Sequence, residues 1–280
     1  MSGDAFRSLP PLREIVKVYG IVAEKKLGQN FLFDLNLTDK IARSSGPLAD
    51  VTVIEVGPGP GALTRSILAA GAKKVVAIEM DDRCLEALGH YLVPVAGNRL
   101  ELVKGDALVV NEATLVQGRA KVIANLPYNV ATTLLFKWLD MLPMFESLTL
   151  MFQKEVAERI IAPPRSKAYG RVSVMAQWLC TIHHEMDIPP QAFNPPPKVT
   201  SSVITLVPRK EPLAPASKPL LERTCKAAFG QRRKMLRKSL QQITPNPELL
   251  LKAAGIAPER RPEELSVTEF CSLARALEQA

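Results

Sequence analysis

Four consecutive residues, Asn125 to Tyr128, have the groups needed to present an aromatic amine to an electrophile. The exocyclic amine of adenine is a weak nucleophile because its lone pair is delocalised into the ring. The amide oxygen of Asn125 and the backbone carbonyl of Leu126 could each accept one amine hydrogen, leaving the lone pair to point at an electrophile. Pro127 would stiffen the turn, and Tyr128 offers a ring on which an extruded base could stack. If the electrophile is already activated, positioning would supply much of the rate without an acid–base pair.

A glycine-rich loop upstream indicates a site for a nucleoside. The loop, Val56 to Gly61, follows a β-type run and opens a helical one, and its glycines permit positive φ and close approach of a ligand. Glu79 stands eighteen residues beyond Gly61, at the end of the next predicted strand, where a carboxylate can accept both hydroxyls of a ribose. Asp106, after the third predicted strand, adds a carboxylate that could bind an adenine amino group.

The spacing of this loop discriminates between nucleoside cofactors. Dinucleotide-binding loops read G-x-G-x-x-G, whereas this one reads G-x-G-x-G, and no lysine of the Walker type follows. Acids at the ends of two strands suit an uncharged nucleoside better than a pyrophosphate, which favours S-adenosylmethionine over NAD. An NAD-dependent oxidoreductase is the alternative, and the lack of an acid–base residue suited to a hydride site disfavours it.

The elements that must position these residues follow an α/β pattern. The predicted strands are 51–55, 74–79, 100–103, 121–124, 147–152, 181–187 and 202–207. The predicted helices of this part are 12–19, 37–43 (capped by Asp34 or Asn36), 62–70, 81–91, 130–139 and 154–161. The alternation predicts βαβ units and a parallel sheet covered on both faces. The motif residues would then meet at the carboxyl edge of the strands, where open α/β sheets bind ligands.

The end of the chain has a different character. Residues 208–219 contain four prolines and no apolar cluster, which indicates a linker. Beyond it only helical patterns follow, over 220–229, 232–242, 247–254 and 268–277. We therefore predict an α/β domain over 1–207 and a helical domain over 220–280.

The positive charge of the chain is concentrated in one stretch. The formal net charge is +8, and residues 209–238 alone hold ten Lys or Arg against two Glu, so the rest of the chain is close to neutral. The densest part, 231–238, has apolar residues at helical spacing and predicts a basic amphipathic helix. Confined to one domain beside an enzyme-like domain, this charge favours a nucleic-acid surface over a merely solvated helix face.

Composition excludes several other classes of protein. No apolar run approaches the roughly 18 residues that cross a bilayer, and the first 17 residues resemble neither a secretory signal nor a transit peptide. The four cysteines are far apart, which favours a reducing cytoplasm over a disulfide framework or a zinc cluster. His183 and His184 adjoin on a predicted strand and would point to opposite faces, so we expect no metal site.

In this order and spacing the motifs resemble those of bacterial small-subunit ribosomal RNA adenine dimethyltransferases, a family related to the erythromycin-resistance rRNA methyltransferases. The resemblance extends from about Leu27 to Leu277. It rests on the motifs Leu27–Leu32, Glu55–Thr64, Glu79, Gly105–Ala107, Asn125–Tyr128, Gln153–Ala157, Tyr169–Gly170, Phe193–Val199 and Arg232–Lys234. It implies an α/β fold, a Rossmann-like S-adenosylmethionine-dependent methyltransferase sheet with a small all-α C-terminal domain. Residues 1–45 would form N-terminal helices and the segment that closes over the cofactor.

The resemblance also implies roles for individual residues. Asn30 and Leu32 would line the methionine end of the cofactor, and Phe193 would close on the target base opposite Tyr128. The expected cofactor-binding residues are Gln29, Asn30, Leu32, Gly57, Gly59, Gly61, Glu79, Met80, Asp106, Ala107 and Asn125. The expected catalytic residues are Asn125, Leu126, Pro127, Tyr128 and Phe193. The expected RNA-binding residues are Lys154, Arg159, Lys198, Arg232, Arg233, Lys234, Arg237 and Lys238.

The substrate implied by the resemblance is a pair of adjacent adenosines in the 3′-terminal hairpin loop of small-subunit (16S) rRNA. Each would become N6,N6-dimethyladenosine, with four S-adenosylmethionine molecules consumed by a monomeric enzyme. Lys238 departs from the family pattern, which has Asn there, and Val172 stands where Leu is commoner. Two further alternatives are a large-subunit rRNA methyltransferase of the antibiotic-resistance type and a non-catalytic nucleic-acid-binding assembly or transcription factor on the same scaffold. The intact Asn125–Tyr128 motif favours catalysis.

Overall fold

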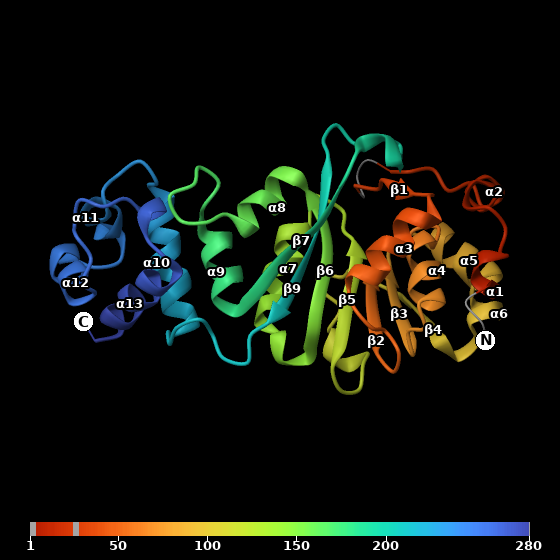
Figure 1. Ribbon diagram of the computed structural model, residues 1–280, viewed down its shortest axis with the longest axis horizontal. Helices are drawn as coiled ribbons and strands as arrows, with labels where there is room; N and C mark the ends of the chain where they lie inside the picture. The colour runs from red at the N-terminus through yellow and green to blue at the C-terminus, as the bar shows by residue number, and fades with distance from the viewer. Residues whose placement is uncertain (1–3, 25–27, 280) are drawn as a thin grey trace. The chain divides into compact units, whose positions relative to one another are not determined.

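A computed structural model describes residues 4–24 and 28–279 (Figure 1). Leu27, the first residue of one motif named above, lies outside the described residues. Contacts divide the chain into two compact units. The first unit comprises the chain up to Lys154 together with His183–Pro208, and the second comprises Glu155–Ile182 and the chain from Arg209 onward.

The first unit begins with short elements that lead toward the sheet. These are α1 (Asp4–Arg7), α2 (Leu12–Val18), β1 (Phe31–Leu32) and α3 (Leu35–Ser44). Asp34 caps α3, because its side chain accepts a hydrogen bond from the backbone N–H of Asn36 at 2.9 Å. Of the two predicted caps, Asp34 is therefore the one used.

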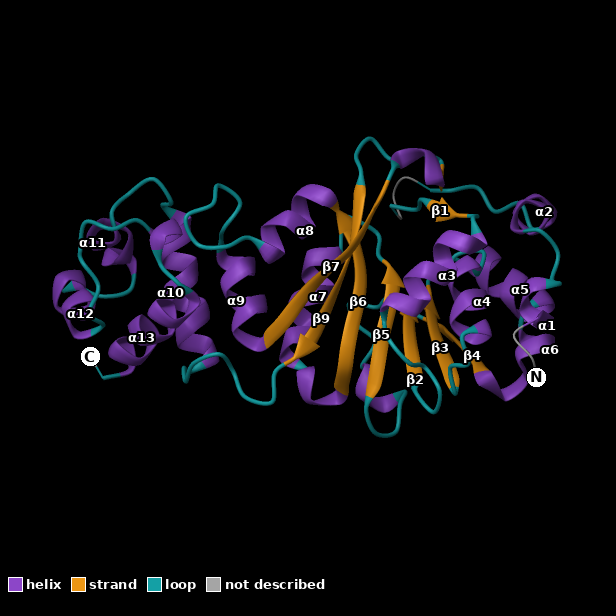
Figure 2. Ribbon diagram, viewed as in Figure 1, coloured by secondary structure: helices purple, strands orange, loops and turns teal. Residues whose placement is uncertain are grey.

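Seven strands form the main sheet, in the order β4 (Leu100–Lys104), β3 (Lys74–Glu79), β2 (Thr52–Val56), β5 (Ala120–Asn125), β6 (Phe145–Gln153), β9 (Ser201–Pro208) and β7 (Cys180–Ile188). Figure 2 shows these strands side by side with helices packed against them. The first five in this order pair in parallel, as predicted, whereas β9 pairs antiparallel to β6. The prediction of a wholly parallel sheet is therefore wrong at this edge.

The order of the strands places a ligand crevice between β2 and β5. The chain moves from β2 to β3 in one direction across the sheet and from β5 to β6 in the other, while β2 and β5 are neighbours. Because β–α–β crossovers are right-handed, α4 (Ala62–Ala69) and α7 (Ala131–Asp140) must cover opposite faces. Such a switch point leaves a crevice at the carboxyl ends of the two strands.

The remaining helices of this unit cover the β3–β4 side of the sheet. They are α5 (Asp82–Tyr91) and the short α6 (Val93–Ala96), and both contact β4. The side chain of Asp81 accepts a hydrogen bond from the backbone N–H of Arg83 at 3.1 Å and so caps the start of α5. Buried Val53, Ile67 and Val75 contribute to one apolar cluster, which fixes the crevice on a rigid frame.

The second unit is helical. It includes most of α8 (Lys154–Ile161), α9 (Arg171–Leu179), α10 (Lys218–Gly230), α11 (Leu236–Ser239), α12 (Pro247–Ala253) and α13 (Val267–Glu278). The sequence prediction missed α9, and this helix contacts both α10 and α13. Residues 155–182 thus group with the C-terminal helices, whereas the predicted α/β domain ran through to 207.

The predicted helix over 232–242 is wrong. Helix α10 ends at Gly230, residues 231–235 form a turn, and only the short α11 and a 3₁₀ turn over 240–242 follow. The backbone N–H groups of Leu236 and Arg237 instead donate to the carbonyls of Arg260 and Pro258, at 2.8 and 3.2 Å. These bonds to a distant loop replace the intrahelical bonds that a continuous helix would need.

Over the described residues, no helix is both long enough and apolar enough to cross a membrane.

Candidate active site

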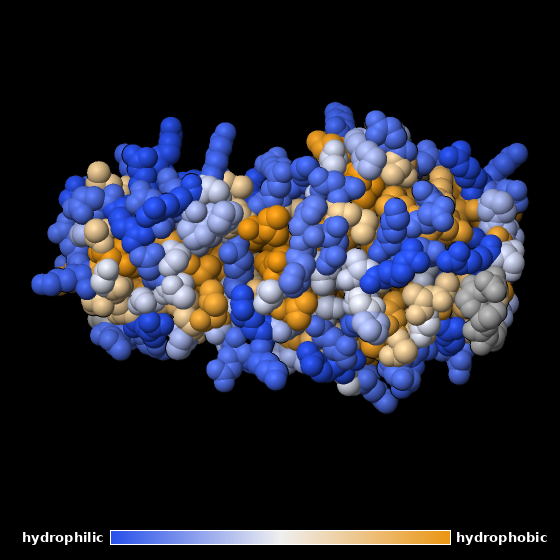
Figure 3. Space-filling view, in the orientation of Figure 1, coloured by the Kyte–Doolittle hydropathy of each residue, from blue (hydrophilic) through white to orange (hydrophobic). Residues whose placement is uncertain are grey.

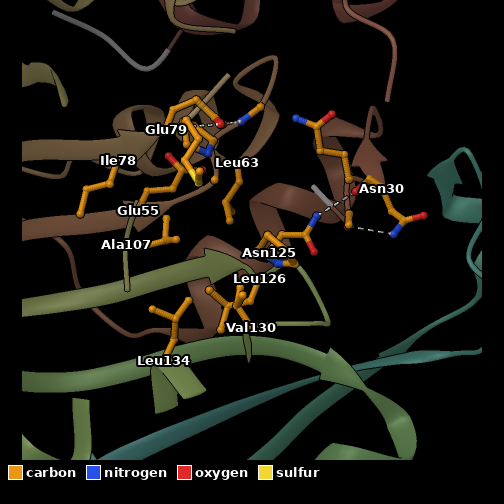
Figure 4. A pocket seen from close by; sticks show the side chains of 18 of the residues that line it. Asn30, Glu55, Leu63, Ile78, Glu79, Ala107, Asn125, Leu126, Val130 and Leu134 are labelled. Carbon is orange, nitrogen blue, oxygen red and sulfur yellow. Dashed lines mark hydrogen bonds between the residues drawn. The ribbon is translucent and has the colours of Figure 1, made fainter. Parts of the chain in front are cut away.

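A cavity of about 290 Å³ lies in the first unit and is built around the crevice between β2 and β5. Its walls come from the ends of β2, β3 and β5, from the loop after β4, and from the N-terminal segment (residues 28–32) (Figure 4). Among the predicted site residues it is lined by Gln29, Asn30, Leu32, Gly57, Gly59, Glu79, Met80, Asp106, Ala107, Asn125, Leu126, Pro127 and Tyr128. Residues as far apart in sequence as Gln29 and Tyr128 therefore face one space.

The glycine loop needs glycine for two separate reasons. Gly57 and Gly59 have φ of +68° and +54°, a region that side-chain-bearing residues rarely adopt. A Cβ atom at Gly59 would also lie 2.9 Å from the ring of Phe31, which belongs to the N-terminal segment. The loop can therefore lie against this segment and line the cavity only because Gly59 lacks a side chain.

Glu79 ends β3 with its carboxylate held by backbone groups. Its Oε2 accepts from Gly59 N at 3.0 Å, and its Oε1 accepts from the N–H groups of Met80 and Asp81 at 2.8 and 2.9 Å. Burial raises the pKa of Glu79, and these three backbone bonds oppose that rise. A carboxylate has about four acceptor positions, so a direction remains for a ribose hydroxyl.

Asp106 occupies the matching place after β4. Its Oδ1 accepts from the backbone N–H of Leu108 at 2.8 Å, which closes a tight turn and fixes the carboxyl group. The backbone N–H of Gly105 donates to the carbonyl of Glu79 at 3.0 Å, which ties this turn to the end of β3. The two carboxylates predicted for the nucleoside thus belong to one hydrogen-bonded frame.

The N-terminal segment is fastened to α5 by an ion-pair network. Gln29 accepts from the backbone N–H of Glu24 at 3.0 Å and donates to Asp81 Oδ2 at 3.1 Å. Arg83 contacts both Asp81 and Glu24, at 2.7 and 2.8 Å. Both the oxygen and the nitrogen of the Gln29 amide are therefore hydrogen-bonded within the protein, and these bonds position the N-terminal segment.

Asn125, at the end of β5, is oriented by the same segment. Its Nδ2 donates to the backbone carbonyl of Asn30 at 3.1 Å (Figure 4). No hydrogen bond to its Oδ1 is found among the described residues. The amide thus keeps an acceptor at the cavity, beside Leu126 and Pro127.

Tyr128 is held by its hydroxyl group. The Oη atom lies 2.6 Å from Ser201 Oγ on β9, and burial raises the pKa of the phenol. Because the hydroxyl is anchored at one end, the ring has a fixed orientation at the cavity wall. A fixed ring is suited to stacking against a base.

Two predicted residues do not line the cavity. Gly61 has φ of +92° at the start of α4, and a Cβ there would collide with Tyr91 and Leu88, so its glycine is required for packing. Phe193 is only 4% exposed and belongs to the apolar cluster of the first unit, and it pairs with Leu32 through β8 (Phe193–Asn194) and β1.

The predicted RNA-binding residues differ in how they are engaged. Lys154 forms an ion pair with Asp187 at 2.6 Å and Arg159 one with Glu155 at 2.7 Å. Within the second unit, Arg232 donates to the carbonyl of Ser166 at 3.1 Å and lies 4.0 Å from Glu263. Arg237 lies 3.8 Å from Glu259 and 4.0 Å from Glu248.

The other basic side chains are available to a partner. Arg233, Lys234 and Lys238 are exposed, and no ion pair to them occurs among the residues that the structure describes; the same holds for Lys198. Lys234 and Lys238 line a surface hollow together with Gln231, Gln241 and Gln242. Hydrophilic side chains cover much of this unit on the face shown in Figure 3.

Sequence reasoning missed two residues of the site. Ser201 was missed because β9 returns antiparallel to β6, and nothing in the local sequence announces the contact with Tyr128. Glu55 had a usable signal, because it is an acid at the end of a buried strand immediately before the glycine loop.

The chain matches the family described as ribosomal RNA adenine dimethylase over residues 21–279. A protein named ribosomal RNA small subunit methyltransferase A from Xanthobacter autotrophicus is 56% identical over 279 residues, which cover 98% of this chain and 96% of that protein. The protein of the same name from Paramagnetospirillum magneticum is 53% identical over 270 residues, covering 96% and 95%.

Two solved structures share the fold at lower identity. A dimethyladenosine transferase from Plasmodium falciparum has a TM-score of 0.75 at 25% identity and covers 89% of this chain and 98% of its own. The 23S rRNA methyltransferase ErmE has a TM-score of 0.66 at 26% identity and covers 89% and 100%. With a family match over nearly the whole length and a cavity lined by most of the expected cofactor-binding and catalytic residues, the chain belongs to the ribosomal RNA adenine dimethylase family and is an S-adenosylmethionine-dependent rRNA adenine N6,N6-dimethyltransferase.

Proposed function

We propose that this enzyme dimethylates N6 of two adjacent adenosines in the 3′-terminal hairpin loop of small-subunit rRNA, during assembly of that subunit. The relatives that are 53–56% identical over nearly the whole chain are named as small-subunit methyltransferases. ErmE, which is named for 23S rRNA, is only 26% identical. This difference favours the small subunit over the antibiotic-resistance alternative.

The observation that carries the proposal is the orientation of Asn125. Its Nδ2 is used by the carbonyl of Asn30, so Oδ1 is the atom left to accept a hydrogen from a target amine. Leu126 follows at the cavity wall with its backbone carbonyl, and Tyr128 presents an anchored ring. Two acceptors and one stacking face are the groups that an extruded adenine requires.

The cavity also fits the methyl donor. Glu79 and Asp106 would hold the ribose and the adenine, and the cradle left by Gly57 and Gly59 admits the cofactor close to the backbone. When bound, S-adenosylmethionine supplies an activated methyl group. The protein contributes binding, orientation of the amine and exclusion of water, and Asn125 links the segment that covers the cofactor with the target base.

We further propose that the exposed side chains Arg233, Lys234 and Lys238 bind rRNA phosphates. Cationic side chains without an internal partner can release counterions from RNA, whereas Arg232 and Arg237 are engaged within the protein. We also propose that the enzyme works in the cytoplasm as a monomer. All four cysteines are buried and unpaired, as a reducing compartment allows.

The test is methylation of purified ribosomal subunits. Small subunits that lack these methyl groups would be incubated with labelled S-adenosylmethionine, and the labelled nucleotides mapped. We expect label on two adjacent adenosines near the 3′ end of small-subunit rRNA, with up to four methyl groups per subunit. Label confined to large-subunit rRNA would contradict the proposal, and light scattering of the pure protein would test the monomer.

A further inference from the structure

The loop that follows β4 is held from one side by a lysine of α7. The Nζ atom of Lys137 donates to the backbone carbonyl of Ala107 at 2.7 Å and also to the backbone carbonyl of Val110. The Oε2 atom of Glu112 lies 2.7 Å from the same nitrogen atom. One ammonium group therefore contacts three residues of the stretch 107–112, and an ammonium group has the three N–H donors that such an arrangement uses.

The carboxyl group of Glu112 is buried and keeps this lysine in place. Glu112 is 0% exposed, and its Oε1 atom accepts from the indole Nε1 of Trp138, the neighbour of Lys137 on α7, at 2.7 Å. A buried carboxylate needs both a hydrogen bond and an opposite charge, and α7 supplies them through two consecutive residues. The Lys137 side chain is itself only 21% exposed. The ion pair is therefore largely shielded from water and has a defined geometry.

This loop carries the carboxyl group that we propose to bind the adenine. Asp106 directly precedes Ala107, and its backbone carbonyl accepts from the N–H of Val110 at 2.9 Å. The two carbonyls that Lys137 binds therefore belong to the residue next to Asp106 and to a residue hydrogen-bonded to it. A Cβ atom at Gly105 would lie 2.7 Å from Cγ2 of Val110, so the loop folds back closely on itself. A shift of the two carbonyls would consequently displace Asp106.

The helix that provides the lysine also reaches the cavity. Leu134 of α7 lines the cavity, as does Ala107 of the loop (Figure 4). Lys137 stands three residues after Leu134 and so lies on the same side of the helix. On the other side of the loop, the backbone N–H of Gly105 donates to the carbonyl of Glu79 at 3.0 Å. The loop is therefore attached to both β3 and α7, and the proposed adenine-binding carboxyl group lies between the two attachments.

We propose that Lys137 is a positioning residue for the selectivity of the enzyme for adenine. It fixes the loop so that the carboxylate of Asp106 accepts from the amino group of the cofactor and repels a carbonyl oxygen at the same place. A carboxylate that could move would accommodate either group, whereas a fixed one discriminates between them. Lys137 is not one of the described residues that line the cavity, so it acts through Asp106 and not by contact with the ligand. This inference rests on the proposed place of Asp106 at the adenine.

The experiment compares the binding of S-adenosylhomocysteine with that of S-inosylhomocysteine, in which an oxygen atom replaces the amino group. Calorimetry gives the ratio of the two affinities, which should be about tenfold or more in wild type. Lys137→Met should lower this ratio about three- to tenfold, which is the contribution of one ordinary hydrogen bond. In methylation assays KM for S-adenosylmethionine should rise while kcat stays within about twofold of wild type, because the groups around the target amine stay in place.

A second variant guards against a failure to fold. Lys137→Met alone leaves the buried carboxylate of Glu112 without an opposite charge, which destabilises the protein. The double variant Lys137→Met, Glu112→Gln leaves no unpaired charge, since a glutamine oxygen still accepts from Trp138, and it should show the same loss of selectivity. The matched control is Lys74→Met. It removes an ion pair with Glu101 at the amino end of β3, outside the cavity lining, and should leave the ratio unchanged.

Combination with Asp106→Asn separates positioning from general destabilisation. Asp106→Asn should abolish most of the selectivity, and the addition of Lys137→Met should lower it no further, because both changes act through the same carboxyl group. Additive losses of selectivity in the combined variant would overturn the proposal. So would a lower thermal stability with an unchanged affinity ratio in Lys137→Met and in the double variant with Glu112→Gln. Equal affinities of wild type for the two ligands would reject the proposed place of Asp106, and this inference with it, a failure that wild type alone reveals.

Discussion

A hydrogen bond of 3.0 Å from the backbone N–H of Gly59 to Oε2 of Glu79 joins the glycine loop to the end of β3. We propose that this one carboxyl group both holds the glycine loop close to the cofactor and binds the ribose. The same side chain accepts from Met80 and Asp81, and Asp81 in turn accepts from Gln29 of the N-terminal segment. Loss of Glu79 should consequently affect the whole cavity.

The first prediction concerns Glu79→Ala. Removal of its charge-assisted hydrogen bonds should cost about 1.5–3 kcal/mol, which is roughly a tenfold to hundredfold loss of affinity for S-adenosylmethionine. Titration calorimetry measures this loss, and Glu86→Ala on the exposed side of α5 is the matched control. Unchanged affinity in Glu79→Ala would remove the residue from the site.

The second prediction concerns Asn125→Ala. The variant loses both the acceptor for the target amine and the donor to Asn30 O, so turnover should fall by at least about a hundredfold through misplacement of the amine. Binding of small subunits should persist, because the RNA contacts that we propose are made by other residues. Single-turnover methylation at saturating cofactor separates chemistry from affinity. If saturating cofactor restored the rate, Asn125 would serve only to hold the N-terminal segment.

The third prediction compares Tyr128→Phe with Tyr128→Ala. Stacking needs the ring, so Tyr128→Phe should keep most activity, while Tyr128→Ala should lose about 1–3 kcal/mol of base stacking. The contact with Ser201 gives the hydroxyl an orienting role, and Ser201→Ala should therefore reproduce the small effect of Tyr128→Phe. Measured kcat/KM should be no lower in the double variant than in Tyr128→Phe. A Tyr128→Phe enzyme as inactive as Tyr128→Ala would assign the hydroxyl a chemical role.

Local sequence was sufficient to predict most of the strands and loops that surround the cavity. The strand–loop–helix order around Gly57 and the acid at Glu79 predicted both the crevice and the residues that line it, because glycine conformation and strand ends are decided locally. The antiparallel β9 could not be foreseen, since pairing with β6 depends on a return of the chain from 200 onward. The packing of Phe193 and Gly61 likewise depends on neighbours that only the tertiary structure supplies.

The basic segment, residues 231–238, also has a conformation that local sequence alone could not predict. Its charge and spacing suggested one continuous amphipathic helix, but the N–H groups of Leu236 and Arg237 find carbonyl partners in the 258–260 loop. The periodicity of apolar residues in a sequence cannot show that a distant carbonyl competes with an intrahelical one for a backbone N–H group. The outcome matters for function, because it separates Arg232 and Arg237, which are engaged within the protein, from the exposed Arg233, Lys234 and Lys238.

The last prediction uses this separation. The triple variant Arg233→Gln, Lys234→Gln, Lys238→Gln should weaken binding to small subunits and flatten the log–log salt dependence by about 2–3 units, since each lost phosphate contact contributes about 0.7–0.9. Its thermal stability and cofactor affinity should stay close to wild type, because no described ion pair is lost. The matched control removes the same charge from exposed lysine side chains elsewhere in the second unit, with Lys210→Gln, Lys226→Gln and Lys252→Gln.

Arg232→Gln should behave differently from that triple variant. It gives up the bond to Ser166 O and the proximity to Glu263, so it should lower the free energy of unfolding by about 0.5–1.5 kcal/mol. The slope of the log–log salt dependence of its binding to small subunits should change by less than one unit, because this guanidinium is already engaged within the protein. Salt titrations of binding and thermal unfolding, for the two triple variants and Arg232→Gln beside wild type, test both predictions. Equal flattening by the control triple would mean that net charge and not this segment attracts the RNA. An unchanged slope in the first triple would move the RNA surface to Lys154, Arg159 and the 165–171 loop.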